Sequence, residues 1–258
     1  MDYFALTSYQ ALYFAGVFFL ASFVKGTSSF GYSLVATPLL ALSVGLKQSI
    51  ATLMLPNLLM DLIFICRRGG VKPRQLADLK WFYVGAFPTI YLGTKIVVTG
   101  SPSFLLFFLG CTTLAYVALS ALREPIMLEK GTHPPRDAFL GGLYGGFLGV
   151  TNAAGPVAAI YLTALGQTKS DFVKNFALIS LLTKAVQLSS ISYYQILSVQ
   201  TALLSLLMLV PLGAGFLAGI KMQDQLSESQ FNQIILLMLA ATGIGLIWQA
   251  SGELLGNI

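Results

Sequence analysis

Two polar stretches that interrupt long apolar sequence decide the fold of this chain. The first is Lys25-Gly-Thr-Ser-Ser-Phe-Gly-Tyr-Ser33, and the second is Leu148-Gly-Val-Thr-Asn-Ala-Ala-Gly-Pro156. Both belong to a chain with extended runs free of charge, at residues 3–24, 26–46, 96–122, 138–168, 185–220 and 229–252. Each run can supply the roughly 20 apolar residues that cross about 30 Å of hydrocarbon. The sequence therefore predicts an all-α integral membrane protein with several spans.

The composition of the 258 residues supports this class. It is 56% hydrophobic and 10% charged, with a mean hydropathy of +0.78, and a water-soluble domain could not cover that much apolar surface. The net charge of +5 comes from cations that flank the apolar runs, which favours membrane orientation over nucleic-acid binding. Cys66 and Cys111 lie in or beside apolar runs, and no Cys/His spacing suits a metal, so we expect no disulfide framework, metal or cofactor.

Gly, Pro and charged residues divide the chain into ten predicted helices. The first begins without a basic residue, so we expect a retained helix rather than a cleaved signal peptide. The predicted helices are 9–25, 28–45, 48–66, 79–98, 103–122, 138–149, 152–165, 171–190, 196–219 and 229–249.

A shift of 123 residues lays the second half of the sequence over the first without a gap. The shift pairs Pro88 with Pro211, Gly26 with Gly149, and the first polar stretch with the second. We therefore predict two transmembrane repeats, residues 1–122 and 138–258, joined by a linker at 123–137.

The positive-inside rule favours an inverted relation between these repeats. The linker at residues 67–80 carries the strongest basic cluster and is predicted to be cytoplasmic, together with the 123–137 linker. Both chain termini are then outside a multi-pass protein of the cell (inner) membrane. Inversion requires an odd number of crossings in each half. Five crossings, or three crossings plus a re-entrant hairpin of the first two segments, both meet this condition.

The two polar stretches predict an anion site. In a bilayer, unwound backbone survives only where protein or a wet cavity satisfies its N–H and C=O groups. Each stretch precedes a helix whose first turn offers free N–H groups, with Ser28 or Ser29 and Thr151 or Asn152 as candidate caps. Paired broken segments in two halves also point to a transporter's binding site. The alternative is that these glycines and hydroxyls only allow close helix packing.

At this site the backbone N–H groups of residues 28–30 and 151–153 are expected to hold the oxygen atoms of the anion, while a lysine supplies the attraction. Gly26 and Gly149 would let the backbone approach the anion. The predicted substrate-binding residues are Lys25, Thr27, Ser28, Ser29, Asn57, Thr151, Asn152, Ser180 and Lys184. The predicted structural or coupling residues are Gly26, Gly31, Asp61, Gly149, Gly155 and Lys174.

Three charged residues fall inside predicted helices, where a charge normally faces a cavity or a partner. With Asn57 and its equivalent Ser180 at mid-depth, a rise of about 1.5 Å per residue places Asp61 and Lys174 at similar depths on the cytoplasmic side. We therefore predict an Asp61–Lys174 pair. Lys184 would have no acidic partner and could attract an anion.

The stretch Phe23-Val-Lys-Gly-Thr-Ser-Ser-Phe-Gly-Tyr-Ser-Leu-Val-Ala-Thr-Pro resembles the first Gly-rich signature of the TauE/SafE-type sulfite exporter family. Gly149-Val-Thr-Asn-Ala-Ala-Gly-Pro is similar to its second signature, and Arg67-Arg-Gly-Gly-Val resembles the linker that follows. The family often has Gly where this chain has Ser29, Asn152 and Ala154. The resemblance implies a secondary transporter, usually an exporter, of small sulfur-containing oxyanions or organosulfonates.

The sequence thus favours a secondary anion transporter in the lipid bilayer, with a passive anion channel as an alternative. A membrane-embedded enzyme would need titratable residues clustered at one depth, and because the sequence shows no such cluster we expect no catalysis. No nucleotide-binding motif is present, which argues against direct ATP drive; H⁺ and Na⁺ are the candidate coupling ions, and the sequence does not choose between them. The sequence does not identify the anion or the oligomeric state.

Overall fold

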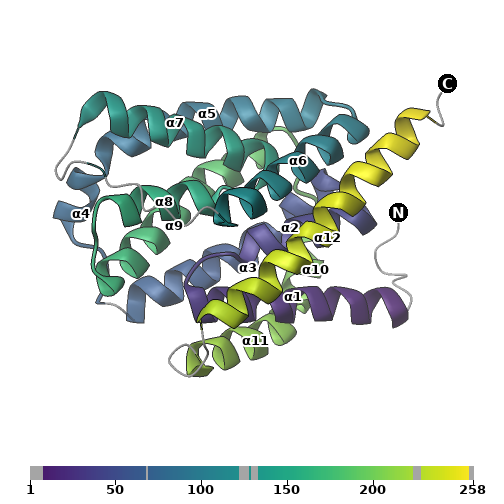
Figure 1. Ribbon diagram of the computed structural model, residues 1–258, viewed down its shortest axis with the longest axis horizontal. Coiled ribbons are helices and arrows are strands. Elements are labelled where there is room, and N and C mark those ends of the chain that lie inside the picture. Colours follow the sequence, from purple (N-terminus) through teal and green to yellow (C-terminus); the bar gives the residue numbers. More distant parts are fainter. Residues whose placement is uncertain (1–7, 68, 122–127, 129–132, 223–227, 256–258) are drawn as a thin grey trace.

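The computed structural model describes residues 8–67, 69–121, 128, 133–222 and 228–255, which form helices and no strands (Figure 1). Both chain tails, which are predicted to be external, lie outside the described residues. So does most of the 123–137 linker, which is predicted to be cytoplasmic. The helices are α1 (Ser8–Ser28), α2 (Tyr32–Val44), α3 (Leu46–Arg67), α4 (Pro73–Asp78), α5 (Lys80–Thr99), α6 (Pro102–Ala121), α7 (Pro134–Thr151), α8 (Gly155–Ala164), α9 (Lys169–Tyr193), α10 (Val199–Leu207), α11 (Leu209–Met222) and α12 (Glu228–Leu255).

Several of these helices can cross a membrane. In the described part of the chain, α1, α3, α5, α6 and α9 are long and apolar enough, and the α10–α11 pair, bent by 45°, can form one further span. The prediction of an all-α membrane protein is confirmed. By contrast, α2 and α8 have 13 and 10 residues, which cover about 20 and 15 Å of a hydrocarbon core of about 30 Å. Their lengths favour a hairpin in each half over five full crossings.

Apart from shifts of helix ends, two details differ from the predicted helices. The predicted single helix at 196–219 is wrong, because α10 ends before Met208 and α11 starts after it. Pro211 explains the break, since it lacks an N–H group and its ring clashes with the carbonyl of the residue four positions earlier. The short helix α4 lies in the basic linker and was not predicted.

The helices of the two halves follow the predicted 123-residue offset. The helices α2 and α8 begin at Tyr32 and Gly155, and α3 and α9 begin at Leu46 and Lys169, in each case 123 residues apart. The backbone agrees as well, because Ser29 and Asn152 are equivalent positions and both adopt positive φ, 72° and 59°. This agreement supports the proposed internal repeat.

Close packing between glycines joins helices from different halves. A Cβ atom added to Gly26 in α1 would lie 2.6 Å from the Phe216 carbonyl oxygen of α11. A Cβ atom added to the equivalent Gly149 in α7 would lie 2.6 Å from the Ile90 carbonyl oxygen of α5. The first helix of each half is therefore packed against the penultimate long helix of the other half.

Hydrogen bonds between distant segments show which helix ends lie together. At one end of the molecule, the Lys47 ammonium donates to the Val98 carbonyl, 2.9 Å away. At the other end, the Leu128 N–H donates to the Ala164 carbonyl at 2.9 Å. Figure 1 shows α4, which carries part of the basic linker, at the end opposite to the start of α1.

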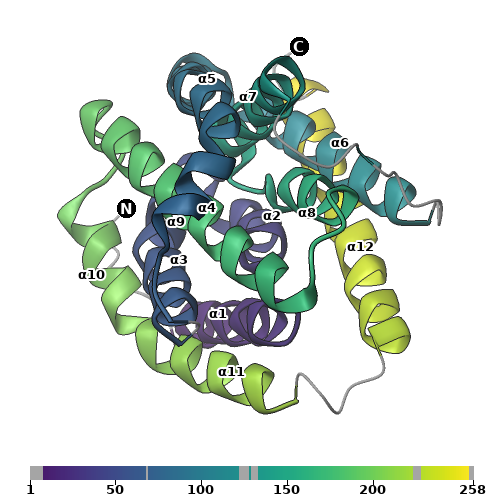
Figure 2. The same ribbon diagram turned by 90° about the vertical axis from the view of Figure 1, so that its left-hand side faces the viewer.

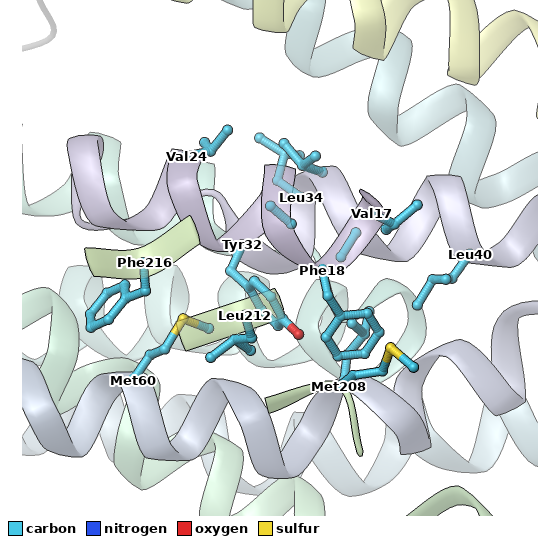
Figure 3. Packing of buried hydrophobic residues seen from close by; sticks show 14 of the residues in the cluster. Val17, Phe18, Val24, Tyr32, Leu34, Leu40, Met60, Met208, Leu212 and Phe216 are labelled. Atoms are coloured by element: carbon cyan, nitrogen blue, oxygen red, sulfur yellow. The ribbon is translucent and has the colours of Figure 1, made fainter. Parts of the chain in front are cut away.

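The largest apolar cluster packs around the hairpin of α1 and α2. Figure 3 shows Tyr32 of α2 pointing toward Phe18 and Leu212, and the Phe18 and Tyr32 rings meet edge to face at 6.3 Å. Farther along the same cluster, the rings of Phe64 and Phe216 are 5.0 Å apart. This packing fixes the hairpin against α3 and α11 and so positions the polar groups at its tip.

Candidate functional site

A buried ion pair lies beside the break between α1 and α2. The Lys25 ammonium, in the last turn of α1, is 2.5 Å from Asp61 Oδ1 of α3, and the two side chains are 2% and 0% exposed. Lys25 also donates to Asn57 Oδ1, one turn earlier on α3. Desolvation of both charges is offset only by such close pairing and by additional hydrogen bonds.

The second oxygen of Asp61 receives a hydrogen bond from the other half of the chain. Ser180 Oγ of α9 donates to Asp61 Oδ2 at 2.5 Å. The predicted Asp61–Lys174 pair is therefore wrong, because Lys25 and Ser180 occupy the carboxylate, and Lys174 is only half-buried near the start of α9. Lys174 and Asp61 are predicted to lie at similar depths on α9 and α3, but the long side chain of Lys25 reaches Asp61 from a third helix, α1.

A second buried lysine lies on the opposite side of the same polar cluster. The Lys184 ammonium of α9 donates to Asn152 Oδ1 in the break between α7 and α8, and to Ser33 Oγ of α2 at 3.3 Å. Its side chain is 2% exposed, yet among the described residues no carboxylate oxygen lies within 4 Å of it. In the described part of the chain, Lys184 is thus a buried cation whose direct hydrogen-bond contacts are neutral oxygen atoms.

Two hydroxyl residues of α2, Ser33 and Thr37, complete the cluster and were missed in the sequence. Asn57 Nδ2 donates to Ser33 Oγ at 2.9 Å, and Asn152 Nδ2 donates to Thr37 Oγ1 at 3.2 Å. Both residues are buried and lie one helical turn apart. The signal that could have identified them is their spacing: they follow the first break and lie four residues apart, which places both side chains on the same face of α2.

The cluster surrounds a small cavity of about 30 Å³. That volume exceeds the 10–15 Å³ that one water molecule needs. The cavity brings together Lys25, Asn57, Asn152, Ser180 and Lys184, which the sequence analysis proposed for one site. It is also lined by Phe30, Gly31, Tyr32, Ser33, Leu34, Tyr144, Leu148, Gly155 and Phe176.

The helix caps and backbone donors differ from those predicted. Ser29 and Asn152 end the preceding helices, because their N–H groups donate to the carbonyls of Lys25 and Leu148. The helix α2 starts later, after Gly31 with φ 95°, and α8 starts after Ala154, neither with a side-chain cap. The amides of residues 28–30 and 151–153 are therefore not the donors expected.

The first turn of α2 lines the cavity instead, and the first N–H groups of a helix have no partner within that helix.

Three further hydroxyl groups predicted for the site bond to their own helices. Thr27 donates to the Val24 carbonyl at 2.9 Å, and Thr151 donates to the Phe147 carbonyl at 2.7 Å. Ser28 Oγ lies 2.7 Å from the Val24 carbonyl oxygen. These groups stabilise the ends of α1 and α7. The fourth hydroxyl, Ser29 Oγ, is buried and has no hydrogen-bond partner among the residues that the structure describes.

Gly26 and Gly149 pack against backbone rather than the cavity, so the expectation that they admit the anion is wrong and the packing alternative holds for both. Gly31 and Gly155, by contrast, line the cavity. A Cβ atom added to Gly155 would stay 3.7 Å from the Phe176 ring, so space remains beside it.

Long apolar helices that surround a buried charged cluster at two helix breaks define a membrane transport protein. The family model described as Sulfite exporter TauE/SafE matches residues 14–246, and the chain belongs to this family. No curated protein and no solved structure is significantly similar to the chain. Within the described residues, no group of three His, Cys, Asp or Glu side chains is placed to hold a metal ion.

Proposed function

We propose that this protein is a secondary transporter that exports a small sulfur-containing oxyanion or organosulfonate of the sulfite type. The observation that carries the proposal is Lys184, a buried ammonium beside a polar cavity with no carboxylate in direct contact among the described residues. Membership of the family supports transport as the activity of the protein. It also supports a role for the cavity in transport rather than in catalysis.

The charge balance of the cluster favours an anion as the occupant. Lys25 and Lys184 are both buried, and Asp61, which is paired with Lys25, is the acidic residue of the cluster. With all three groups ionised, one positive charge has no counter-charge within the cluster. An uncompensated charge in a poorly solvated interior is costly, so a bound monoanion stabilises this arrangement.

The neighbouring groups can hold the oxygen atoms of such an anion. The Lys184 ammonium now donates to Asn152 and Ser33, and an anion oxygen can replace either of these neutral acceptors. The first turn of α2 lines the same cavity, and the start of a helix offers free N–H groups and the positive end of the helix dipole. Together they provide one cation and several directional donors for a compact oxyanion.

We further propose that residues 1–122 and 138–258 are inverted repeats, each a hairpin followed by three crossings. The exposed basic residues at the end of α3 and in α4, Arg67, Lys72 and Arg74, favour a cytoplasmic position for that end of the molecule. Both chain termini would then be outside.

A proteoliposome assay tests the transport proposal and separates it from the channel alternative. Vesicles loaded with unlabelled sulfite should accumulate labelled sulfite above its external concentration by counterflow, with competition by thiosulfate or methanesulfonate. A pH or Na⁺ gradient imposed in separate runs identifies the coupling ion. Flux that never exceeds equilibrium would make the protein a channel, and absence of flux for all sulfur anions would refute the proposed substrate class.

A further inference from the structure

A groove of about 870 Å³ lies between α6 and α8 and ends at the two helix breaks. Figure 2 shows α6, α8 and α2 close together, with α12 passing nearby. Its walls are largely apolar, with several hydroxyl groups. The lining residues at its inner end are Phe30, Leu34, Thr112, Thr151 and Ala153.

The groove runs from the site toward one particular end of the molecule. On α6 it is lined from Thr112 to Ser120, one residue before the helix ends. On α8 it reaches Thr163, in the last turn, beside the bond between Leu128 and Ala164. This is the end at which the basic linkers are expected to be cytoplasmic.

The equivalent position in the first half is closed. Ile160 of α8 is 47% exposed, whereas its equivalent in α2, Thr37, is 0% exposed. Thr163 is exposed, whereas its equivalent Leu40 is 1% exposed. Leu40 shares an apolar cluster with Leu239 of α12. The helix α12 thus covers α2, while its counterpart α6 leaves α8 open.

Two apolar side chains separate the groove from the polar cavity. Phe30 and Leu34 line both spaces. The Phe30 ring is held by Phe176 and Phe172 of α9, at centroid distances of 5.7 and 6.3 Å. The position equivalent to Phe30 in the second half is Ala153, so this ring has no counterpart in the other break.

We infer that the groove between α6 and α8 is the aqueous passage between the polar site and the cytoplasmic face, and that Phe30 is its gate. This inference rests on the proposed transport function, and it identifies the structure as the conformation of the transporter that is open to the cytoplasm. The structure is open on the cytoplasmic side up to Phe30 and closed on the opposite side by α12. A small anion reaches Lys184 only when the Phe30 ring leaves Phe176.

Cysteine accessibility tests the passage without any transported substrate, so a failed transport assay and a failed passage remain distinguishable. In a background with Cys66→Ser and Cys111→Ala, Ala159→Cys reports on the groove and Gly155→Cys on the cavity. The buried equivalent of Ala159 on α2, Ala36→Cys, is the matched control. The probe is the charged thiol reagent sulfonatoethyl methanethiosulfonate, applied to inverted vesicles and to intact cells.

The reagent should modify Ala159→Cys from the cytoplasmic face and leave Ala36→Cys unmodified from either face. Adding Phe30→Ala should raise the modification rate of Gly155→Cys roughly tenfold, because the gate loses its ring contacts with α9. A conservative Phe30→Leu change should give a smaller increase, and size-exclusion elution checks folding.

Modification of Ala159→Cys by a lipophilic maleimide alone would show a lipid-filled groove and overturn the inference. An unchanged rate at Gly155→Cys in the Phe30→Ala protein would remove Phe30 as the gate.

Discussion

Replacing Lys184 by glutamine removes the buried cation that the proposed function depends on and keeps a hydrogen-bond donor of similar length. At about 4 Å, two unit charges attract by about 4 kcal/mol when the effective dielectric constant is near 20. The glutamine amide recovers roughly 1 kcal/mol through a hydrogen bond. We therefore expect Lys184→Gln to weaken oxyanion binding by about 2–3 kcal/mol, or roughly 30- to 150-fold in Kd.

The control for this change lies on the same helix. Lys174→Gln removes the same charge from a half-buried position ten residues earlier, about 15 Å along α9. At that distance through water the interaction is worth about 0.3 kcal/mol, so the Kd should change by less than about twofold. The pair of variants therefore separates a local contact from a general effect of net charge.

Binding of sulfite to the purified protein, measured by calorimetry in lipid nanodiscs, gives both Kd values directly. A thermal unfolding curve without ligand checks the fold, which should survive Lys184→Gln because the change strands no carboxylate among the described residues. Equal Kd values for Lys184→Gln and the unmodified protein, or equal losses in both variants, would refute the assignment of Lys184 to the anion site.

Three further predictions concern stability and topology. Lys25→Met should lower the free energy of unfolding by about 3–5 kcal/mol, because Asp61 is left buried without its cation, and adding Asp61→Asn should recover part of that loss in denaturation of the detergent-solubilised protein. A further loss in the double variant would contradict the pairing. Gly149→Ala should cost about 1–3 kcal/mol by forcing α7 away from α5, whereas Gly146→Ala, which meets no atom within 4 Å, should change the unfolding temperature little. Equal effects of the two would remove the packing role. Ser8→Cys should react with an impermeant maleimide in intact cells, and reaction only in inverted vesicles would reverse the proposed orientation.

The membrane class and the gathering of the central residues could be predicted from the sequence because they depend on strong local signals. A charge inside an apolar run stands out, and so does a glycine-containing polar stretch that occurs twice at the same offset. These signals selected Lys25, Asn152 and Lys184, and the structure places all three around one cavity. Whether they bind substrate is the prediction that the Lys184 experiment tests.

The partners of these residues were harder to predict because they depend on how helices pack. Depth along a straight helix indicated Lys174 for Asp61, but the actual partner reaches across from a different helix. Ser33 and Thr37 were missed since small hydroxyl residues are common in membrane helices and usually bond to their own backbone. The starts of α2 and α8 were predicted too early because Ser29 and Asn152, which precede them, adopt the left-handed conformation and extend the turn.

The connections within the polar cluster distinguish contacts inside each half from contacts between the halves. Lys25 pairs with Asp61 inside the first half, and Lys184 bonds to Asn152 inside the second. The side-chain hydrogen bonds described between the two halves of the cluster each involve a hydroxyl group. They are Ser180 with Asp61, Lys184 with Ser33, and Asn152 with Thr37.

This division lowers the energetic cost of rearranging the polar cluster itself. Separating a buried ion pair would cost several kcal/mol, whereas a hydrogen bond to a hydroxyl is worth about 1–3 kcal/mol and can be replaced by water or by an anion oxygen. The charged groups can therefore keep their partners within each half while the hydroxyl contacts exchange. A bound oxyanion would substitute for Ser33 at Lys184, so it would loosen a contact between the halves at the moment it is bound. The same residues would then hold the anion and let the hydroxyl contacts of the cluster exchange.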